Sequence, residues 1–291
     1  MKIKSGWSDR ILDFICYGTV AVLCISIILP FWNLISTSIT PKSEVSLSFQ
    51  WLPDTIDLGA WKMVLNSGFI WSSFKNTIFR TVFGTLIAMF LQITFAYPLS
   101  RDDFSTRKFF QTVILITMFF SGGLIPVYMT ISQLGLIDTI WALVLPGSMS
   151  AFNIILLKNY FRQIPKSMTE AAVIDGANDI CILFKIIIPL SKPILATVGL
   201  WTIVGQWNSW FDCLLYINDR TKYVLQIMLR ELQANVAALN IGGAGIDPST
   251  APPSAALVAA SSLFVIMPIV CVYPFLQKYF VKGIMVGGVK G

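Results

Sequence analysis

The side chains that most often carry out chemistry in proteins are scarce in this sequence. Histidine, the commonest general base and metal ligand, does not occur among the 291 residues. The five cysteines are scattered and form no CxxC pair, which argues against a metal or redox site. The glycine-rich stretch Gly242-Gly243-Ala244-Gly245 lacks the lysine of a phosphate-binding P-loop. We therefore expect no catalytic residues, no metal and no cofactor in this chain.

One polar segment, EAAVIDGANDICILFKIIIPLSKP at 170–193, interrupts otherwise apolar sequence. Ser167 and Glu170 have the spacing of a capping box, which predicts that a helix starts there. The pair Asp175-Gly176 predicts that this helix is short, because glycine readily takes the positive φ that follows a helix end. The helix would then turn sharply into a second one.

The second helix is predicted from its cap and its apolar period. Asn178 or Asp179 can cap its start, and Pro189 would end it. Its apolar face, spaced i, i+3, i+4 and i+7, would pack under the membrane helices: Ile180, Leu183, Phe184 and Ile187. Together the two helices form a compact helix-turn-helix. It is either a knob that docks on a partner or an amphipathic loop resting on lipid headgroups.

The composition places these elements in a membrane protein. Of the residues, 55% are hydrophobic and only 12% are charged, with a mean hydropathy of +0.73. The net charge of +6 is not arranged as a basic run with interleaved aromatic residues, so we expect no nucleic-acid binding. We expect an all-α, polytopic protein held in membrane lipid.

Six apolar segments are long enough to cross a bilayer, which needs about 20 residues. They are 14–34, 77–99, 109–131, 140–160, 194–215 and 255–275. Prolines fall in several of them: Pro30, Pro126, Pro146 and Pro268. The stretch SGGLIP at 121–126 predicts non-helical backbone, which either faces a pathway or partner helix or is a kink relieved by neighbouring helices.

Lysine and arginine are distributed unevenly between the two sides of these segments. One side carries 14 of the 21 basic residues, although two segments on the opposite side are each longer than any on this one. Because basic residues favour the cytoplasmic side, both termini and segment 161–193 are predicted to be cytoplasmic.

The helix-turn-helix segment resembles the EAA loop of ABC-importer permeases. The matching residues are Glu170, Ala171, Ala172, Asp175, Gly176, Ala177, Phe184 and Pro189, followed by Leu190 and Pro193. QWNSW at 206–210 and QKYFVKG at 277–283 are similar to the carbohydrate-uptake subgroup related to the maltose permease inner subunit. SGGLIP at 121–126 and APPSA at 251–255 look most like permeases for lipo-oligosaccharides and pectin fragments.

This resemblance implies the fold of a type I ABC-importer permease. Residues 1–291 would form one transmembrane domain of a bacterial plasma-membrane protein, with 161–193 as the coupling loop and 73–280 as the core permease region. The implied partners are a second homologous permease, a cytoplasmic ABC ATPase dimer that binds ATP and Mg, and an extracytoplasmic solute-binding lipoprotein. The chain would not itself be an enzyme. It would form half of the pathway for a carbohydrate, most consistently an oligosaccharide, with a simple sugar or glycerol phosphate as the alternative.

The resemblance also gives two sets of site residues. The EAA residues named above, from Glu170 to Pro189, would couple the permease to the ATPase. Sugars stack on aromatic rings and bind amides, so a sugar pathway is one interpretation of an aromatic and glycine set: Trp201, Trp207, Asn208, Trp210, Gly122 and Gly123. An ordinary interfacial belt of aromatic residues is the other.

Two other classes of function fit less well. An ion-coupled secondary transporter should carry paired acidic residues within its spans or an inverted repeat, whereas the acidic residues in these segments are Asp13 and Asp212, both near the ends. A membrane enzyme would need an acid–base or metal constellation, which the lack of histidine disfavours.

Overall fold

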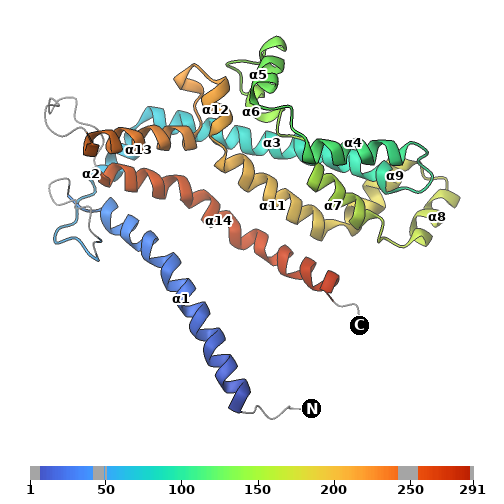
Figure 1. Cartoon of the computed structure of the whole chain (residues 1–291), viewed down its shortest axis with the longest axis horizontal. Coiled ribbons are helices and arrows are strands. Elements are labelled where there is room, and N and C mark those ends of the chain that lie inside the picture. The colour runs from blue at the N-terminus through green and yellow to red at the C-terminus, as the bar shows by residue number, and fades with distance from the viewer. Residues whose placement is uncertain (1–6, 42–48, 50, 242–254, 289–291) are drawn as a thin grey trace. The chain divides into compact units, whose positions relative to one another are not determined.

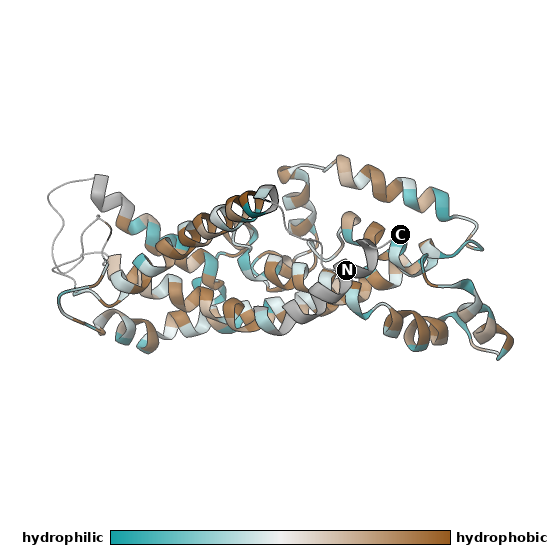
Figure 2. Cartoon of the chain, turned by 90° about the horizontal axis from the view of Figure 1, so that it is seen from below, coloured by the Kyte–Doolittle hydropathy of each residue, from teal (hydrophilic) through white to brown (hydrophobic). Residues whose placement is uncertain are grey.

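The computed structural model describes residues 7–41, 49, 51–241 and 255–288. Within these residues the regular structure is helical, with no strand, as expected (Figure 1). Hydrophobic residues run along the lengths of the helices (Figure 2). The chain forms two compact units: Met1–Ser67 with Leu229–Ile266, and Gly68–Met228 with Met267–Gly291.

The first unit contains a long helix whose sides are all apolar. This is α1 (Trp7–Ser38), and none of its most apolar stretch is buried within the chain. An apolar helix of this length without protein cover is typical of a membrane span. The indole nitrogen Nε1 of Trp32 donates to the backbone oxygen of Trp51 at 2.7 Å, which ties the following segment to α1. The shorter α2 (Gly59–Asn66) completes this part.

The second unit contains the remaining helices, apart from two that extend over both units. Its elements are α3 (Gly68–Ser100), α4 (Arg107–Phe119), α5 (Leu124–Gln133), α6 (Trp141–Val144), α7 (Ala151–Phe161), α8 (Lys166–Ile174), α9 (Asp179–Ile182), η1 (Leu183–Ile187), α10 (Ile188–Leu190), α11 (Lys192–Asn208), α12 (Phe211–Tyr216) and η2 (Arg220–Lys222). The two helices that extend over both units are α13 (Leu225–Ile241) and α14 (Ala255–Gly288).

Helix α3 organises the second unit through a stripe of small buried residues. Ser73, Thr77, Gly84, Ala88 and Ala96 recur at intervals of four, seven or eight positions, which places them along one face of the helix. Small side chains let helix backbones approach closely inside a membrane, and α7 and α11 pack against this helix. The approach is tightest at Gly84, where an added Cβ would lie 2.9 Å from the amide carbon of one α11 side chain, Gln206. A side chain at this position would have to displace the Gln206 amide, so glycine permits the close approach of α3 and α11.

Several of the predicted spans are interrupted. Non-helical backbone was predicted at 121–126 and is found at 120–123, while 124–126 already belong to α5. Gly123 has φ +86°, and α4 and α5 are bent by 115° across this break. Pro146 lies in the break between α6 and α7, whereas Pro30 and Pro268 lie inside the continuous helices α1 and α14. The third segment is therefore broken at its glycine pair, whereas Pro30 and Pro268 leave their helices continuous.

Among the described residues, three helices are long and apolar enough to cross a membrane, and two bent pairs raise the number to five. The three are α1, α3 and the apolar part of α14. The bent pairs are α4 with α5, and the 179–190 helix with α11. The predicted segment 140–160 is divided between α6 and α7, which are each too short to qualify alone.

Candidate functional site

The predicted helix-turn-helix is present at one tip of the second unit (Figure 1). Its first helix, α8, has no buried residue. The predicted capping box is wrong: the N-cap is Pro165, with no side-chain cap hydrogen bond, and Ser167 already lies inside the first turn. The helix starts two residues earlier than expected, after Pro165, which has no backbone N–H that a helix start would leave unpaired.

The turn after α8 confirms the prediction for Gly176, which has φ +79°. Its backbone N–H donates to the oxygen of Val173 at 3.0 Å, and the N–H of Ala177 donates to the oxygen of Ala172 at 2.9 Å. This pair of bonds is a Schellman motif, with the two alanines packed against the same core cluster. The exit angle of α8 is therefore set by one left-handed glycine and two short side chains.

The second helix starts as predicted but ends later. The side chain of Asn178 accepts a hydrogen bond from the backbone N–H of Cys181 at 2.8 Å, so Asn178 is the cap. The helix continues through the π-helical stretch η1 and through α10 to Leu190. Pro189 therefore does not end it, because the wide turns before it remove the need for an ordinary hydrogen bond at the proline.

The predicted apolar face of this second helix is half wrong. Ile182, Leu183 and Ile187 are buried, but Ile180 and Phe184 are exposed. With three side chains of the first helix, these two give the apolar tip, defined here as the exposed residues Met168, Val173, Ile174, Ile180 and Phe184. Ile174 is the most open of them, with 86% of its surface exposed. Several large apolar side chains exposed on one short segment are typical of a docking surface.

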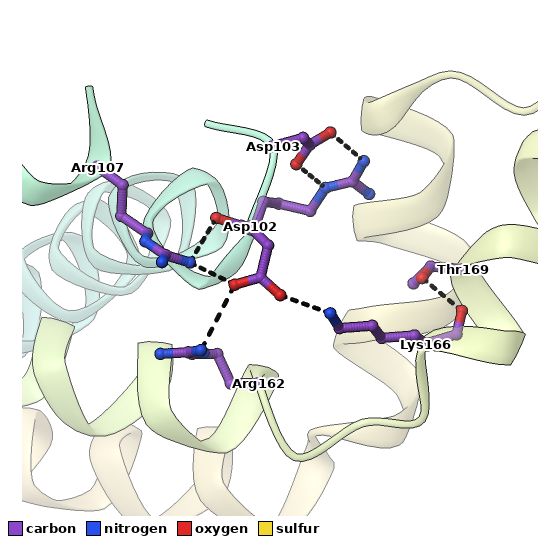
Figure 3. A network of polar contacts seen from close by, with 7 residues as sticks. Asp102, Asp103, Arg107, Arg162, Lys166 and Thr169 are labelled. Atoms are coloured by element: carbon purple, nitrogen blue, oxygen red, sulfur yellow. Dashed lines mark hydrogen bonds and ion pairs between the residues drawn. The ribbon is translucent and has the colours of Figure 1, made fainter. Parts of the chain in front are cut away.

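A carboxylate outside the segment holds the start of α8 (Figure 3). Asp102, in the turn between α3 and α4, accepts a hydrogen bond from Lys166 Nζ at 2.6 Å. It also accepts from Arg107 Nη1 at 2.6 Å and from Arg162 Nη2 at 3.4 Å. One side chain thus joins the first residue of α8 to the start of α4 and to the end of α7. We call this group, Asp102 with its three cations, the clamp.

The Asp102 carboxylate at the centre of the clamp stays charged over the whole neutral range. Hydrogen bonds from Lys166 and then Arg107 hold the pKa of the Asp102 carboxyl far below its usual range. A carboxyl whose pKa is lowered by folding stabilises the fold at any pH above its ordinary value and loses that contribution only in acid. The link between Asp102 and α8 is therefore constant at physiological pH rather than a pH-sensitive contact.

Open space lies on two sides of α8. A groove of about 760 Å³ has Glu170 and Val173 in its wall, opposite Arg101 and Asp102. A second, shallower cleft is lined by Met168 and Ala171 of α8 and by Pro189 and Leu190 of the second helix, among other residues. A short helix with open space on two sides can be gripped by a partner.

A buried ion pair lies elsewhere in this unit, inside the helix bundle. Arg80 of α3 is only 2% exposed, and its Nη1 donates to Asp212 Oδ1 at 3.1 Å while its Nη2 donates to Asp212 Oδ2. Arg80 Nε donates to Gln206 Oε1 and Nη1 to the backbone oxygen of Ser209, both at 3.1 Å. The guanidinium is thereby satisfied on several sides, which is how a buried charge is tolerated.

A polar cavity of about 460 Å³ adjoins this ion pair. Its volume is within the ~300–1,000 Å³ typical of ligand pockets. The walls come from α3, α7, α11 and α12, with the 146–150 turn, and the polar or aromatic side chains are Arg80, Gln92, Ser150, Asn153, Trp201, Thr202, Gln206, Ser209, Asp212 and Tyr216. No group of metal-binding side chains occurs within the part of the chain that the structure describes.

Comparison with known proteins decides the family. No protein-family model matches the chain. The polygalacturonan/rhamnogalacturonan transport system permease protein YtcP of Bacillus subtilis (strain 168) is 38% identical over 284 residues, which cover 97% of this chain and 99% of that protein. This chain belongs to the permease subunits of carbohydrate ABC importers. The family consists of integral membrane transport subunits, not enzymes, so the expected class of function is confirmed and the ion-coupled transporter is not supported.

Solved structures of alginate importers share the fold of the permease. A chain of a bacterial ABC transporter involved in the import of the acidic polysaccharide alginate superposes with a TM-score of 0.85 and 32% identity, covering 96% of the permease and 100% of that chain. A second alginate transporter, solved in complex with an alginate pentasaccharide-bound periplasmic protein, gives a TM-score of 0.63 at 16% identity, covering 93% and 95%. The second likeness concerns the fold alone.

The structure separates the predicted pathway residues of the permease. Trp201 lines the polar cavity with 42% of its surface exposed. Trp207 is buried instead, packs edge-to-face on Phe74 and faces an apolar cavity. Asn208 is exposed and accepts a hydrogen bond from Gln226 Nε2 at 3.4 Å. These three neighbours in sequence therefore do not meet at one site.

The remaining pathway predictions lie outside the polar cavity. Trp210 packs against Phe211 and the core cluster around Cys213. Gly122 and Gly123 are exposed in the break between α4 and α5. The residues of APPSA before Ala255 lie outside the described residues, and so do the side chains of 275–283.

Sequence reasoning missed the polar side chains of α3 that line the cavity. Arg80 and Gln92 both lie inside the predicted span 77–99, and an ionisable residue there marks a functional or structural site by default. They share the face of the small-residue stripe of α3, which is the signal that could have shown that they point into the bundle.

Proposed function

We propose that this permease forms half of an oligosaccharide pathway and that segment 161–193 couples the pathway to a separate ATPase. The observation that carries this proposal is α8, a short, fully unburied helix with open space on two sides and a rigid glycine cap at its end. Ala172 of this helix packs against the core cluster, but no residue of the helix is buried, so a partner best explains the exposed surface that remains.

The proposed contact residues fall into two groups. Glu170, Ala171 and Asp175 are exposed and offer charge and clearance to the partner, together with the exposed Phe184 and Pro189. Ala172, Gly176 and Ala177 set the direction of α8 through the Schellman motif. The first group would touch the ATPase, and the second would hold the first in place.

The proposal includes the partners that the family resemblance implies. A second homologous permease would complete the pathway, and a cytoplasmic ABC ATPase dimer would bind ATP and Mg. An extracytoplasmic solute-binding lipoprotein would deliver the sugar. The second alginate transporter was solved with a periplasmic protein, so a transporter chain of this fold can take part in such a complex. The sugars named for the relatives are polymers, polygalacturonan/rhamnogalacturonan and alginate, which favours an oligosaccharide over a simple sugar or glycerol phosphate.

We propose one transmembrane domain over residues 1–291, with a core permease region at 73–280. It would have six spans in the bacterial plasma membrane and both termini in the cytoplasm. The fourth span would consist of α6 and α7, and α4 with α5 would form a bent third span. The excess of basic residues on the side of α8 supports this orientation.

Cysteine labelling tests the proposed orientation. We expect Ile174→Cys, in a variant whose five native cysteines are serine, to react with a membrane-impermeant maleimide in inside-out vesicles only, because residue 174 is exposed at the apolar tip. Bound ATPase should slow the reaction by covering the tip. Labelling in intact cells would place α8 outside and overturn the proposed coupling.

A second measurement tests the energy source. Uptake that survives ATP depletion under a maintained ion gradient would contradict the proposed role of the ATPase.

The clamp gives the coupling a physical route into the membrane helices. A force on α8 reaches Lys166 and through Asp102 reaches the turn that joins α3 to α4. Helix α3 carries the small-residue stripe against which α7 and α11 pack, so movement of this turn would be passed to the centre of the bundle.

Replacing Asp102 tests this route. We expect Asp102→Asn to lower the amount of sugar moved per ATP hydrolysed by the assembled importer, because asparagine cannot hold three cations. The matched control is Asp103→Asn, whose carboxylate pairs with Arg101 in the same turn and touches no residue of α8 in the contacts described. A ratio in Asp102→Asn equal to that of the control would show that the clamp transmits no force.

A further inference from the structure

We infer that the polar cavity beside Arg80 is a subsite for an uncharged, hydroxyl-bearing face of a sugar ring. The inference rests on the proposed function, because it assumes that a carbohydrate passes this permease. It adds that this subunit contributes its own sugar contacts, and it assigns them to residues of α3, α7 and α11.

An unpaired acceptor points to a ligand at this cavity. Gln92 is only 1% exposed, and its Nε2 donates to the backbone oxygen of Ser148 at 3.0 Å. Its Oε1 is buried and has no hydrogen-bond partner in the chain. A buried polar atom without a partner is costly, and Gln92 lines the cavity, so a donor entering the cavity would repay that cost. A sugar hydroxyl is such a donor.

Other side chains of the cavity wall suit the same ligand. Trp201 supplies a half-exposed aromatic surface on which the C–H face of a sugar can stack. Asn153 of α7 and Gln206 of α11 add amides from two further helices. Aromatic surface with a few convergent polar groups is the usual composition of a small-molecule site.

The electrostatics favour an uncharged part of the sugar. Arg80 and Asp212 are the charged side chains among the described residues that line the cavity, and they neutralise each other. A sugar carboxylate would find its cation already occupied by Asp212, whereas a hydroxyl needs only the neutral amides. If the transported chain is acidic, its carboxylates must be bound elsewhere.

The inference is tested by direct binding. The permease is purified with its partner permease and ATPase, without the solute-binding protein. Labelled oligosaccharides are prepared by digesting polygalacturonan and rhamnogalacturonan. The probe is the fraction that cells no longer take up when the gene for this chain is deleted. We expect Gln92→Met to raise the Kd for this probe roughly fivefold, the factor for one neutral hydrogen bond. Gln92→Glu should keep the Kd near the wild-type value, because a protonated glutamate can both donate to Ser148 and accept from the sugar hydroxyl.

Two further variants make the result decisive. Thr81→Val is the matched control, since Thr81 Oγ1 is also buried without a partner but lines the apolar cavity instead. Its Kd should equal that of the wild type. Trp201→Leu should weaken binding without affecting accumulation, because Trp201 is half exposed. For each variant the ratio of Kd to wild type should be the same at low and high salt, as a neutral contact requires.

The outcomes separate this inference from the proposed function. An unchanged Kd in both Gln92→Met and Trp201→Leu would overturn the subsite while uptake in the wild type still supports the importer. If the ratio of variant Kd to wild-type Kd falls as salt rises, the lost contact is ionic and not a hydroxyl hydrogen bond, which would also overturn the inference. Uptake of both digests that survives gene deletion would overturn the oligosaccharide function and the subsite together.

Discussion

Gly176→Val is expected to abolish ATP-driven sugar uptake while the permease still accumulates in the membrane. Gly176 has φ +79°, a conformation that costs an L-residue about 1–2 kcal/mol and a β-branched one more. No atom lies within 4 Å of the position a Cβ would take, so the cost is in the backbone and not in packing. The residue would leave the left-handed region, and α8 would then point in a different direction. Uptake assays and quantified membrane levels measure the two effects.

The chain contains a matched control for this variant. Gly135, after α5, has φ +67° and no atom within 4 Å of an added Cβ. The N–H of Gly135 donates to the backbone oxygen of Ser132 at 3.0 Å, and the N–H of Leu136 donates to the backbone oxygen of Ile131 at 3.1 Å. This is the same Schellman motif as at Gly176. Gly135→Val should therefore carry the same backbone cost without disturbing α8. If both variants reduce uptake equally, the loss is one of stability, and the proposed role of Gly176 in directing α8 is wrong.

Asp212→Asn is expected to destabilise the second unit by about 3 kcal/mol, the range in which a buried ion pair that loses one partner usually falls. Arg80, only 2% exposed, would keep its bonds to Gln206 and Ser209 but lose its counter-charge. Cys213 reports on this region because its side chain is fully buried and its N–H donates to Asp212 Oδ1 at 2.9 Å. Thermal exposure of its thiol to a fluorescent maleimide, with the other four cysteines replaced by serine, measures the change.

The double variant Arg80→Met with Asp212→Leu removes both charges and should unfold nearer to the wild-type temperature than Asp212→Asn does. Asp219→Asn is the control for loss of an exposed pair, since Asp219 lies 3.7 Å from Lys222 at the surface. It should change the unfolding temperature little, because exposed pairs contribute little. If Asp212→Asn and Asp219→Asn unfold at the same temperature, the charge of Asp212 is not needed to stabilise the buried Arg80.

Local signals in the sequence predicted local geometry. The turn at Gly176 and a cap at Asn178 or Asp179 were predicted from residue types alone, because a helix end and a helix cap depend on neighbours a few positions away. The start of α8 and the role of Pro189 were wrong for an equally local reason: more than one residue could satisfy the pattern, and Pro165 and the π-helical turns of η1 prevailed.

Contacts between distant segments were beyond such reasoning. Arg80 and Asp212 are 132 residues apart, and Asp102 and Lys166 are 64 apart. Nothing in either residue's neighbourhood shows which partner it takes, because the pairing follows from how α3 packs on α11 and from where the α3–α4 turn lies. The same holds for Trp201 and Trp207, which are six positions apart but face different cavities.

The apolar tip has a consequence for how subunits are kept in balance. On the proposed coupling, a permease inserted without its ATPase would present Met168, Val173, Ile174, Ile180 and Phe184 to the aqueous phase. Chaperones and quality-control proteases recognise exposed apolar segments of this kind. Orphan copies would therefore be marked for degradation by the same surface that proper assembly hides, so the stoichiometry of the importer could be enforced without separate regulation of its genes.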